Sequence, residues 1–535
     1  NARDNKNESQ INFESFWEPV SHIGDSIQAH FYDMDSTGIP FIYYDYQTSK
    51  FSEKDIELLH NRIMNMAEQV LSNPFIKDIS ILSKEDESII NKFNYSHYDY
   101  DKTEALTNIF QKQVASFPEK PAIIFRSSSI SYKELDEKSN KIANFLLSKN
   151  VEENDVVGVM FHRGLDILPT IWGILKTGAS YLLIDPSLPE DRIQYMLTNA
   201  RAKLVITNLY LNYTSYNLDS INYYSDKCPN IETSNDNRFC VIYTSGSTGT
   251  PKGVELKRIG VINMLNSYKQ ILKTSECERF LSTSTVAFDM FIVENFVSIL
   301  DGKTVILADE DEQKVPAFTC KLIENNNVDF ILSTPSKISL LLEEPSCLKN
   351  VKVIQLGGEV FKPTLYNELK KYTSARIYNG YGPSECTACA SNKLVTDEQI
   401  TIGKPFFNTN IFIMNKDNNV LPPNYPGEIV IKSDGVGKGY INKYDFNDVY
   451  HTGDLGVISN IGELIYLGRK DNQIKLHGLR IELDEITSKI MKIKGISNAI
   501  TVIKKVNDID CICSYIIGDS SLKESYVKSI LYKSL

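Results

Sequence analysis

Apolar and polar positions follow two different periods along this chain, and the two periods predict strands that alternate with helices. From Thr103 onward, short apolar runs of strand length are followed by segments with apolar residues at three- and four-residue spacing. The predicted strands cover residues 122–125, 156–161, 182–186, 203–207 and 239–243, and the predicted helices cover residues 106–116, 131–147 and 167–176. Such an alternation is typical of an α/β protein with a doubly wound parallel sheet.

The stretch before Thr103 has a different pattern. An apolar and aromatic run at residues 41–46 predicts a strand, and helical spacing over residues 53–71 predicts a helix. Residues 86–102 are polar and aromatic without a clear period, which is typical of a linker. The sequence therefore predicts a leader at residues 1–85, a linker at residues 86–102, and the α/β part after them.

Length, charge and cysteine usage narrow the class of protein. A chain of 535 residues exceeds the size of one hydrophobic core, so several domains are expected. The net charge of −11 argues against a nucleic-acid partner, whose binding sites are usually basic. No apolar run reaches membrane-spanning length, and the first residues are polar. Nine cysteines and seven histidines show no metal-binding spacing, so we expect free thiols in a cytoplasmic protein without a membrane partner.

A loop of small and hydroxyl-bearing residues follows the predicted strand at residues 239–243. Its sequence over residues 243–253 is Tyr-Thr-Ser-Gly-Ser-Thr-Gly-Thr-Pro-Lys-Gly. Glycines let backbone N–H groups approach an anion, hydroxyls add donors, and Lys252 adds a positive charge. The loop is not a Walker motif, because Gly253 stands where that motif has a hydroxyl residue for magnesium. The pattern predicts a polyphosphate site rather than a flexible connector.

The same loop resembles the phosphate loop of the adenylate-forming enzymes. Later stretches resemble further motifs of that family in the same order, namely residues 287–289 (AFD), 355–359 (QLGGE), 378–387 (YNGYGPSECT), 450–455 (YHTGDL) and 466–475 (YLGRKDNQIK). The resemblance covers residues 103–535. It implies the adenylate-forming fold: two doubly wound αβ subdomains and a small β-barrel subdomain at residues 103–470, then a partial small α+β domain at residues 471–535. Residues 1–85 resemble the C-terminal part of a condensation domain.

The resemblance implies ATP and Mg²⁺ as cofactors. It implies that Tyr381 stacks on adenine, that Asp454 accepts from the ribose hydroxyls, and that Glu385 holds Mg²⁺, a role suited to a hard carboxylate oxygen. Asp471 is implied to be the hinge between the large and small domains. The implied catalytic residues are Thr244, Lys252, Glu385 and Arg469. The implied nucleotide-binding residues are Thr244, Ser245, Gly246, Ser247, Thr248, Gly249, Lys252, Gly358, Asn379, Tyr381, Gly382, Ser384, Asp454, Tyr466 and Arg469.

Asp289 distinguishes an amino-acid substrate from other carboxylic acids. By resemblance to peptide synthetases it binds the α-ammonium group, and such a charge-assisted hydrogen bond contributes about 1.5–3 kcal/mol. The implied side-chain pocket consists of Met290, Val293, Ser333, Gln355, Gly357, Gly380, Ala388 and Cys389. Two glycines and an alanine are expected to leave volume beside apolar walls. The expected substrate therefore has a medium or large, mostly apolar side chain, with Gln355 and Ser333 able to bind a polar tip.

Together these features identify the chain as resembling an adenylation domain of a nonribosomal peptide synthetase. Such a domain activates an amino acid with Mg·ATP, releases pyrophosphate, and loads the product onto the phosphopantetheine of a carrier domain, with a condensation domain as a further partner. The chain begins at Asn1 and lacks the family's C-terminal lysine segment, so we expect a fragment with very slow adenylation. The alternatives are a stand-alone acyl- or aryl-CoA ligase, which Asp289 and the leader disfavour, and a non-catalytic binding module, which the intact nucleotide motifs disfavour.

Overall fold

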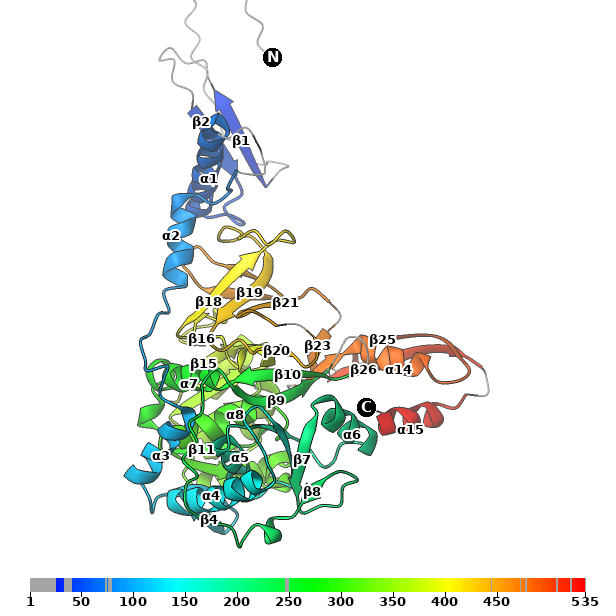
Figure 1. Ribbon diagram of the computed structural model, residues 1–535. Coiled ribbons are helices and arrows are strands. Elements are labelled where there is room, and N and C mark those ends of the chain that lie inside the picture. The colour runs from blue at the N-terminus through cyan, green and yellow to red at the C-terminus, as the bar shows by residue number, and fades with distance from the viewer. Residues whose placement is uncertain are drawn as a thin grey trace, which may run out of the picture. The chain divides into compact units, whose positions relative to one another are not determined.

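The computed structural model describes residues 26–32, 41–72, 75, 79–245, 250–443, 445–471, 473–476, 479–506, 509–519 and 522–534. The chain divides into two compact units, Asn1–Ser88 and Ile89–Leu535. Figure 1 traces the chain through both of them.

The first unit contains an antiparallel strand pair and a long helix. Strands β1 (Ile27–Tyr32) and β2 (Phe41–Tyr46) pair along their full length, and α1 (Glu53–Ser72) follows. Both predicted elements, the strand at residues 41–46 and the helix at residues 53–71, are confirmed. The guanidinium group of Arg62, which is 6% exposed, donates to the carboxylate of Asp86 at 2.7 Å. This buried ion pair joins α1 to the end of the unit.

The predicted irregular linker is wrong at its beginning. Helix α2 (Lys84–Phe93) occupies the first part of that segment. Its start is capped because the hydroxyl of Ser83 accepts from the backbone N–H of Asp86 at 3.2 Å. Three acidic residues in the first turn also stabilise the helix by interacting with the positive end of its dipole. The ten residues of α2 include only three apolar ones, Ile89, Ile90 and Phe93, and this short run was not recognised as helical within a mostly polar stretch.

The second unit contains a seven-stranded sheet whose central strands are parallel. Strand β9, which precedes the predicted phosphate loop, lies next to β6 on one side and β10 on the other. In sheet order the strands are β20 (Gly439–Tyr440), β10 (Lys252–Lys257), β9 (Arg238–Thr244), β6 (Ser180–Leu183), β5 (Val156–Met160), β7 (Ala202–Thr207) and β8 (Ser215–Tyr216). The predicted strand at residues 182–186 is displaced, because β6 covers Ser180–Leu183 and ends before Pro186, a residue that cannot donate to a ladder.

A nine-stranded sheet forms the second α/β layer. In sheet order, the strands from β15 to β3 pair parallel with their neighbours, and antiparallel strands lie at both edges. In sheet order they are β17 (Lys404–Pro405), β16 (Ser391–Leu394), β15 (Arg376–Tyr381), β14 (Val353–Gly357), β13 (Phe330–Ser333), β11 (Arg279–Ser282), β12 (Thr304–Leu307), β3 (Pro121–Phe125) and β4 (Ser128–Ser131).

Helices connect and cover these strands. The start of α4 carries a capping box, in which the Ser131 hydroxyl accepts from the backbone N–H of Glu134 and the Glu134 carboxylate accepts from that of Ser131, and Gly178, with φ of 87°, follows the end of α5. The helices are α3 (Leu106–Ser116), α4 (Tyr132–Ser148), α5 (Ile167–Lys176), α6 (Glu190–Asn199), α7 (Arg258–Ser267), α8 (Met290–Ile292), α9 (Ser298–Leu300), α10 (Glu310–Lys314), α11 (Pro316–Asn325), α12 (Pro335–Leu340) and α13 (Pro363–Leu369).

The remaining strands form small antiparallel sheets. A four-stranded sheet occupies the region of the predicted β-barrel and consists of β18 (Thr409–Met414), β19 (Gly427–Ser433), β21 (Val449–Ile458) and β22 (Leu464–Arg469). The C-terminal elements are β23 (Gln473–Leu476), β24 (Leu479–Glu482), α14 (Leu483–Met491), β25 (Ile496–Val506), β26 (Ile509–Gly518) and α15 (Glu524–Ser534). They are a mixture of helices and strand pairs, as an α+β region requires.

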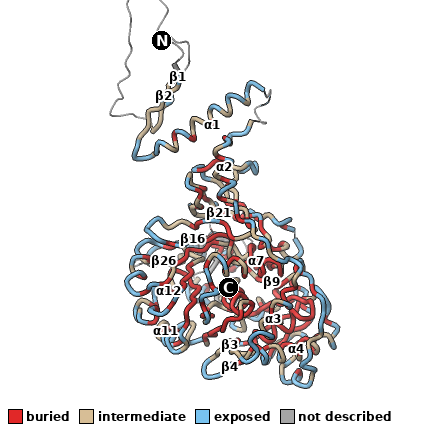
Figure 2. Tube along the Cα trace, turned by 90° about the vertical axis from the view of Figure 1, so that its left-hand side faces the viewer, coloured by how far each residue is buried: buried red, intermediate tan, exposed pale blue. Residues whose placement is uncertain are grey.

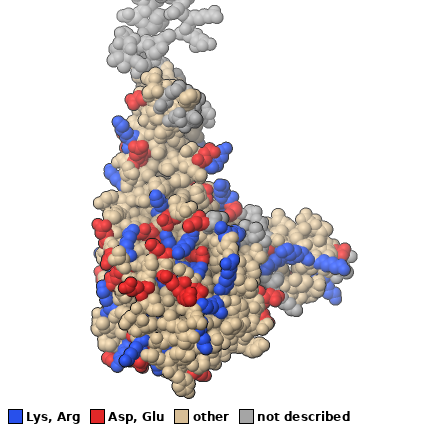
Figure 3. All heavy atoms as spheres, viewed as in Figure 1, with Lys and Arg blue, Asp and Glu red and all other residues tan. Residues whose placement is uncertain are grey.

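One large apolar cluster joins the two α/β layers. Trp172 of α5 is fully buried and stacks on Phe110 of α3, with ring centroids 4.2 Å apart. Figure 2 shows buried residues concentrated around α3, α7, β3 and β9. On the face shown in Figure 3, acidic and basic side chains lie interspersed. No helix in the described part of the chain is both long and apolar enough to span a bilayer.

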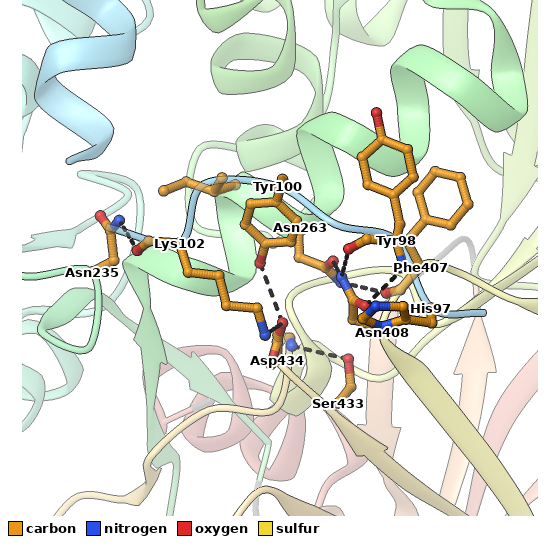
Figure 4. A network of polar contacts seen from close by, with 12 residues as sticks. His97, Tyr98, Tyr100, Lys102, Asn235, Asn263, Phe407, Asn408, Ser433 and Asp434 are labelled. Carbon is orange, nitrogen blue, oxygen red and sulfur yellow. Dashed lines mark hydrogen bonds and ion pairs between the residues drawn. The ribbon is translucent and has the colours of Figure 1, made fainter. Parts of the chain in front are cut away.

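The segment that follows α2, residues 94–102, is held against the rest of the second unit by a polar network (Figure 4). Asn408 accepts from the backbone N–H of Tyr98 at 3.1 Å and donates to its carbonyl at 3.0 Å. The Tyr98 ring stacks on Phe407 at 4.4 Å. Asp434 accepts from the hydroxyl of Tyr100 at 3.2 Å and pairs with Lys102 at 2.6 Å. This part of the predicted linker is therefore docked rather than loose.

Candidate active site

The candidate site is a cavity of about 630 Å³ at the carboxyl ends of parallel strands from both α/β sheets. Thr244 ends β9, Ser333 ends β13, and Gly357 ends β14, and all three residues line the cavity. Ligands of open α/β sheets bind at this edge, because the loops that leave the strands are free to carry functional groups. The strand order therefore assembles segments that lie far apart in the sequence.

Most of the predicted residues line this cavity. From the amino-acid set these are Asp289, Met290, Val293, Ser333, Gln355, Gly357, Gly380, Ala388 and Cys389. From the nucleotide set they are Thr244, Ser245, Gly358, Gly382, Ser384, Asp454 and Arg469. Gly246, Ser247, Thr248 and Gly249 lie outside the described residues.

Five of the predicted nucleotide-site residues do not line the cavity. Lys252, Asn379, Tyr381, Glu385 and Tyr466 are not among the described residues that line it. Asn379 donates to the carbonyl of Thr401 at 2.9 Å and is 5% exposed. Burial raises the pKa of the Tyr466 hydroxyl to about 12. Direct contact of these five side chains with a nucleotide remains a prediction.

Asp454 is the centre of a polar cluster at one end of the cavity. Its Oδ2 atom accepts from the hydroxyl of Tyr381 at 2.5 Å, and its Oδ1 atom accepts from Nη1 of Arg469 at 3.0 Å. Arg469 also donates to both carboxylate oxygens of Asp471, at 2.9 and 2.7 Å. Burial alone would lower the pKa of Arg469, but the hydrogen bonds and charges of Asp471 and Asp454 raise it. Each carboxylate oxygen of Asp454 keeps a second lone pair for a ligand hydroxyl.

The predicted hinge residue is thus tied to the nucleotide cluster. Asp471 follows β22, and its ion pair with Arg469 connects that position to Asp454. A movement about Asp471 would have to change this bidentate pair. The Arg469–Asp471 ion pair therefore connects the predicted hinge to the polar cluster around Asp454.

Asp289 also lines the cavity and stands directly before α8. The buried Tyr268 and the partly buried Cys389 are its neighbours. Burial raises the pKa of the Cys389 thiol to about 12, so this thiol is neutral and not a nucleophile at neutral pH. An anionic carboxylate in such surroundings suits a ligand ammonium group.

Gln355 corrects the prediction that two glycines leave volume for the substrate. A Cβ atom placed on Gly380 would lie 2.6 Å from Nε2 of Gln355. The space that Gly380 opens is therefore filled by the Gln355 amide, which is 1% exposed. The Oε1 atom of Gln355 is buried and has no hydrogen-bond partner among the described residues. The pocket is smaller and more polar at this point than the sequence indicated.

Several cavity residues were not predicted. Lys337 in the first turn of α12 lines the cavity and donates from Nζ to the carbonyl of Thr283 at 3.0 Å. Burial lowers the pKa of Lys337 to about 8, while the neighbouring Glu294 carboxylate acts in the opposite direction. The sequence feature that could have identified Lys337 is its position four residues after Ser333, a predicted pocket residue at the end of β13. Thr283, Tyr268, Gln313 and Arg192 also line the cavity without having been predicted.

The residues present fit a magnesium ion only when a ligand supplies most of its oxygens. Glu385 is a fully buried carboxylate whose Oε1 atom accepts from the hydroxyl of Tyr440 at 2.7 Å. Within the described ranges there is no cluster of three or more acidic, histidine or cysteine side chains that could hold a metal. Mg²⁺ in ATP sites is typically held by one or two carboxylates together with substrate phosphates. In such an arrangement the protein carboxylate would be Glu385, which does not itself line the cavity but is next in sequence to the lining residue Ser384.

Comparison with known proteins agrees with this geometry. The family model described as "AMP-binding enzyme" matches residues 110–441. Gramicidin S synthase 2 of Brevibacillus brevis is 32% identical over 521 residues, which cover 92% of this chain and 12% of that protein. The chain thus spans about an eighth of the length of this curated relative.

Solved structures show the same fold. An artificially fused adenylation–PCP di-domain, NpsA-ThdA from Klebsiella oxytoca, superposes with a TM-score of 0.74 at 20% identity, covering 82% of this chain and 92% of that one. The AMPPNP-bound form of the nonribosomal peptide synthetase FmoA3 gives a TM-score of 0.76 at 22% identity, covering 87% of this chain and 53% of that one. The predicted α/β fold of adenylation domains is confirmed.

Proposed function

Because the chain belongs to the AMP-binding enzyme family, we propose that it activates an amino acid with Mg·ATP to an aminoacyl adenylate and pyrophosphate. One observation carries the proposal. Asp289, suited to an ammonium group, and the Asp454–Arg469 pair, suited to a ribose and a phosphate, line the same cavity. A single molecule that joins an amino acid to AMP would contact both.

The proposed chemistry needs positioning rather than a protein nucleophile. A carboxylate oxygen of the amino acid forms a bond to the α-phosphorus, and the bond from that phosphorus to the bridging oxygen of pyrophosphate breaks. Asp289 would fix the amino acid through its ammonium group, and Thr244, Ser245, Lys252 and Arg469 would hold the phosphates. A bound Mg²⁺ ion, held by Glu385 and phosphate oxygens, would neutralise charge on the phosphates. Correct alignment of the two substrates supplies most of the rate in such reactions.

The proposal extends to the partners of the reaction. After rotation about Asp471, with residues 471–535 as the moving part and residues 103–470 as the fixed part, the phosphopantetheine thiol of a carrier domain would form a thioester with the aminoacyl group. The bond between that group and the phosphate of AMP would break, releasing AMP and the thiol proton. The adenylation–PCP composition of the neighbour NpsA-ThdA supports a carrier-domain partner. The leader at residues 1–85, by its resemblance to the C-terminal part of a condensation domain, supports a condensation domain as the other neighbour. Antibiotic-synthase relatives support a role in nonribosomal peptide synthesis.

The pocket indicates the class of amino acid. Met290, Val293 and Ala388 give it an apolar wall, and Gln355 and Ser333 give it polar groups. Since Gln355 fills the space beside Gly380, we propose a medium-sized, mostly apolar side chain with a hydrogen-bonding tip.

Amino-acid-dependent pyrophosphate exchange tests the proposal. We expect exchange with a subset of amino acids and none with fatty or aryl acids in the protein that contains this chain. Calorimetry on the chain itself should show tight binding of an aminoacyl sulfamoyl adenosine that is lost in Asp289→Ala. Exchange only with aryl or fatty acids would favour a CoA ligase, and no binding of either nucleotide or analogue would favour a non-catalytic module.

A further inference from the structure

Tyr440 lies between two of the motifs that the proposed function uses. It ends strand β20, which pairs antiparallel with β10 so that Tyr440 is opposite Val254. Lys252 begins β10, two residues before Val254. On the other side, the backbone N–H of Gly437 donates to the carbonyl of Glu385 at 2.8 Å. The backbone pairing therefore holds the segment of Tyr440 against both Lys252 and Glu385.

The side chain of Tyr440 contacts both functional groups. Its hydroxyl donates to Oε1 of Glu385 at 2.7 Å, and Nζ of Lys252 lies 5.6 Å from the centroid of its ring. The first contact is a hydrogen bond to a fully buried carboxylate, and the second is within cation–π range. The hydroxyl of Tyr450 lies 3.3 Å from that of Tyr440 and extends the chain of polar groups. One tyrosine thus orients an anion through its hydroxyl and a cation through its ring.

We propose that Tyr440 is a positioning residue for Mg·ATP, orienting the Glu385 carboxylate toward the metal and the Lys252 ammonium group toward the phosphates. The inference rests on the proposed function. A metal held by a single protein carboxylate depends on the direction of that carboxylate, because Mg²⁺ demands near-octahedral geometry. Residues that hydrogen-bond a metal ligand typically change metal affinity by about 10- to 100-fold when they are removed. The ring contact extends the same side chain's influence to the phosphate loop.

Two substitutions separate the two contacts. Tyr440→Phe removes the hydroxyl and keeps the ring, whereas Tyr440→Leu removes both. The matched control is Tyr132→Phe, which also removes a buried hydroxyl, one that donates to the carbonyls of Lys303 and Ile299 at 2.6 and 3.1 Å. Tyr132 does not line the cavity, so it reports the cost of losing buried hydrogen bonds alone.

The measurement is calorimetric binding of AMPPNP to the chain with and without Mg²⁺, together with Mn²⁺ binding followed by electron paramagnetic resonance. We expect Tyr440→Phe to weaken binding of Mg·AMPPNP and of Mn²⁺ in the nucleotide complex about tenfold, with metal-free AMPPNP binding unchanged. Tyr440→Leu should in addition weaken metal-free binding, because the contact with Lys252 is lost. Tyr132→Phe should bind as the wild type does.

Three results would overturn the inference. The first is wild-type affinity for Mg·AMPPNP in Tyr440→Phe. The second is an equal loss with and without metal in that variant, which indicates a general structural effect. The third is a wild-type chain that binds no Mg·AMPPNP, which removes the proposed function as well and is seen before any variant is made.

Discussion

The hydroxyl of Tyr381 donates to Oδ2 of Asp454 at 2.5 Å across 73 residues of sequence, and this bond joins β15 of the nine-stranded sheet to β21 of the antiparallel sheet. Both residues are buried. Burial and the adjacent Asp454 carboxylate raise the pKa of Tyr381 well above its ordinary value, so the phenol stays protonated and remains a donor. The bond therefore fixes the carboxylate proposed to bind the ribose.

Tyr381→Phe should destabilise the fold, because it leaves one oxygen of a buried carboxylate without its donor. Loss of a hydrogen bond to a charged group costs about 1.5–3 kcal/mol of unfolding free energy. Urea unfolding measures it. Tyr466→Phe is the control, since the Tyr466 ring lies 6.1 Å from that of Tyr381 and its hydroxyl makes no hydrogen bond with Asp454 in the described structure. Equal stability of Tyr381→Phe and the wild type would contradict the assigned role of the bond.

Asp289→Asn should weaken binding of the amino acid and leave binding of ATP unchanged. The substitution keeps the size of the side chain and removes the charge that the ammonium group requires, which costs about 1.5–3 kcal/mol, or about 10- to 150-fold in affinity. Separate titrations with the amino acid and with Mg·ATP measure the two effects. An equal loss for both ligands would show that Asp289 supports the cavity as a whole.

Gly380→Ala should change amino-acid selectivity more than stability. The new Cβ atom would lie 2.6 Å from Nε2 of Gln355, and the flexible end of that side chain must then move into the cavity. We expect preference to shift toward smaller side chains, with a stability loss of about 1–3 kcal/mol from overpacking. A substrate panel in the exchange assay measures the shift. The double variant Gly380→Ala with Gln355→Ala should recover the larger substrates, and failure to do so would argue against this contact.

Lys337→Met should remove a pH-dependent part of stability. Burial lowers the pKa of Lys337 to about 8, below the value near 10.4 of an unfolded lysine. Between these two pH values the unfolded chain binds more protons, so the free energy of unfolding rises with pH across the window. The penalty for the buried charge is fully present below about pH 8, and Lys337→Met should therefore be more stable at pH 7 by at most about 3 kcal/mol.

The difference in unfolding free energy between the wild type and Lys337→Met, measured at pH 7 and pH 9.5, isolates this residue from other titrating groups. The advantage of the variant should shrink at the higher pH. Lys321→Met, at an exposed position, is the control and should show no such change. A constant difference across the pH range would rule out a depressed pKa at Lys337.

Asn408→Ala and Asn408→Gly should separate two contributions to the docked segment after α2. Both variants lose the hydrogen bonds to Tyr98 and the bond to Oδ1 of Asn263 at 3.1 Å (Figure 4). Asn408 has φ of 51°, where alanine is strained by about 1–2 kcal/mol and glycine is not. We expect Asn408→Gly to cost about 1–3 kcal/mol in urea unfolding and Asn408→Ala to cost more. The opposite order would contradict the backbone assignment.

The amino-acid sequence by itself determined the local elements and the identity of the functional groups. Helix α3 and the capped start of α4 lie where their patterns placed them, because apolar spacing and capping residues are short-range signals. The strand before the phosphate loop and the glycine-rich motifs were likewise visible as local patterns. Asp289, Asp454 and Arg469 were identified by resemblance, and all of them line one cavity.

Only the tertiary structure decided which side chains meet and which groups fill the remaining space. Gln355 occupies the volume next to Gly380, Lys337 enters the cavity from α12, and Tyr440 connects Glu385 with Lys252. These relationships depend on strand register and on the order of strands in a sheet, which bring together residues far apart in the chain. A sequence pattern records the preferences of neighbouring residues, whereas a pocket is set by packing between distant ones.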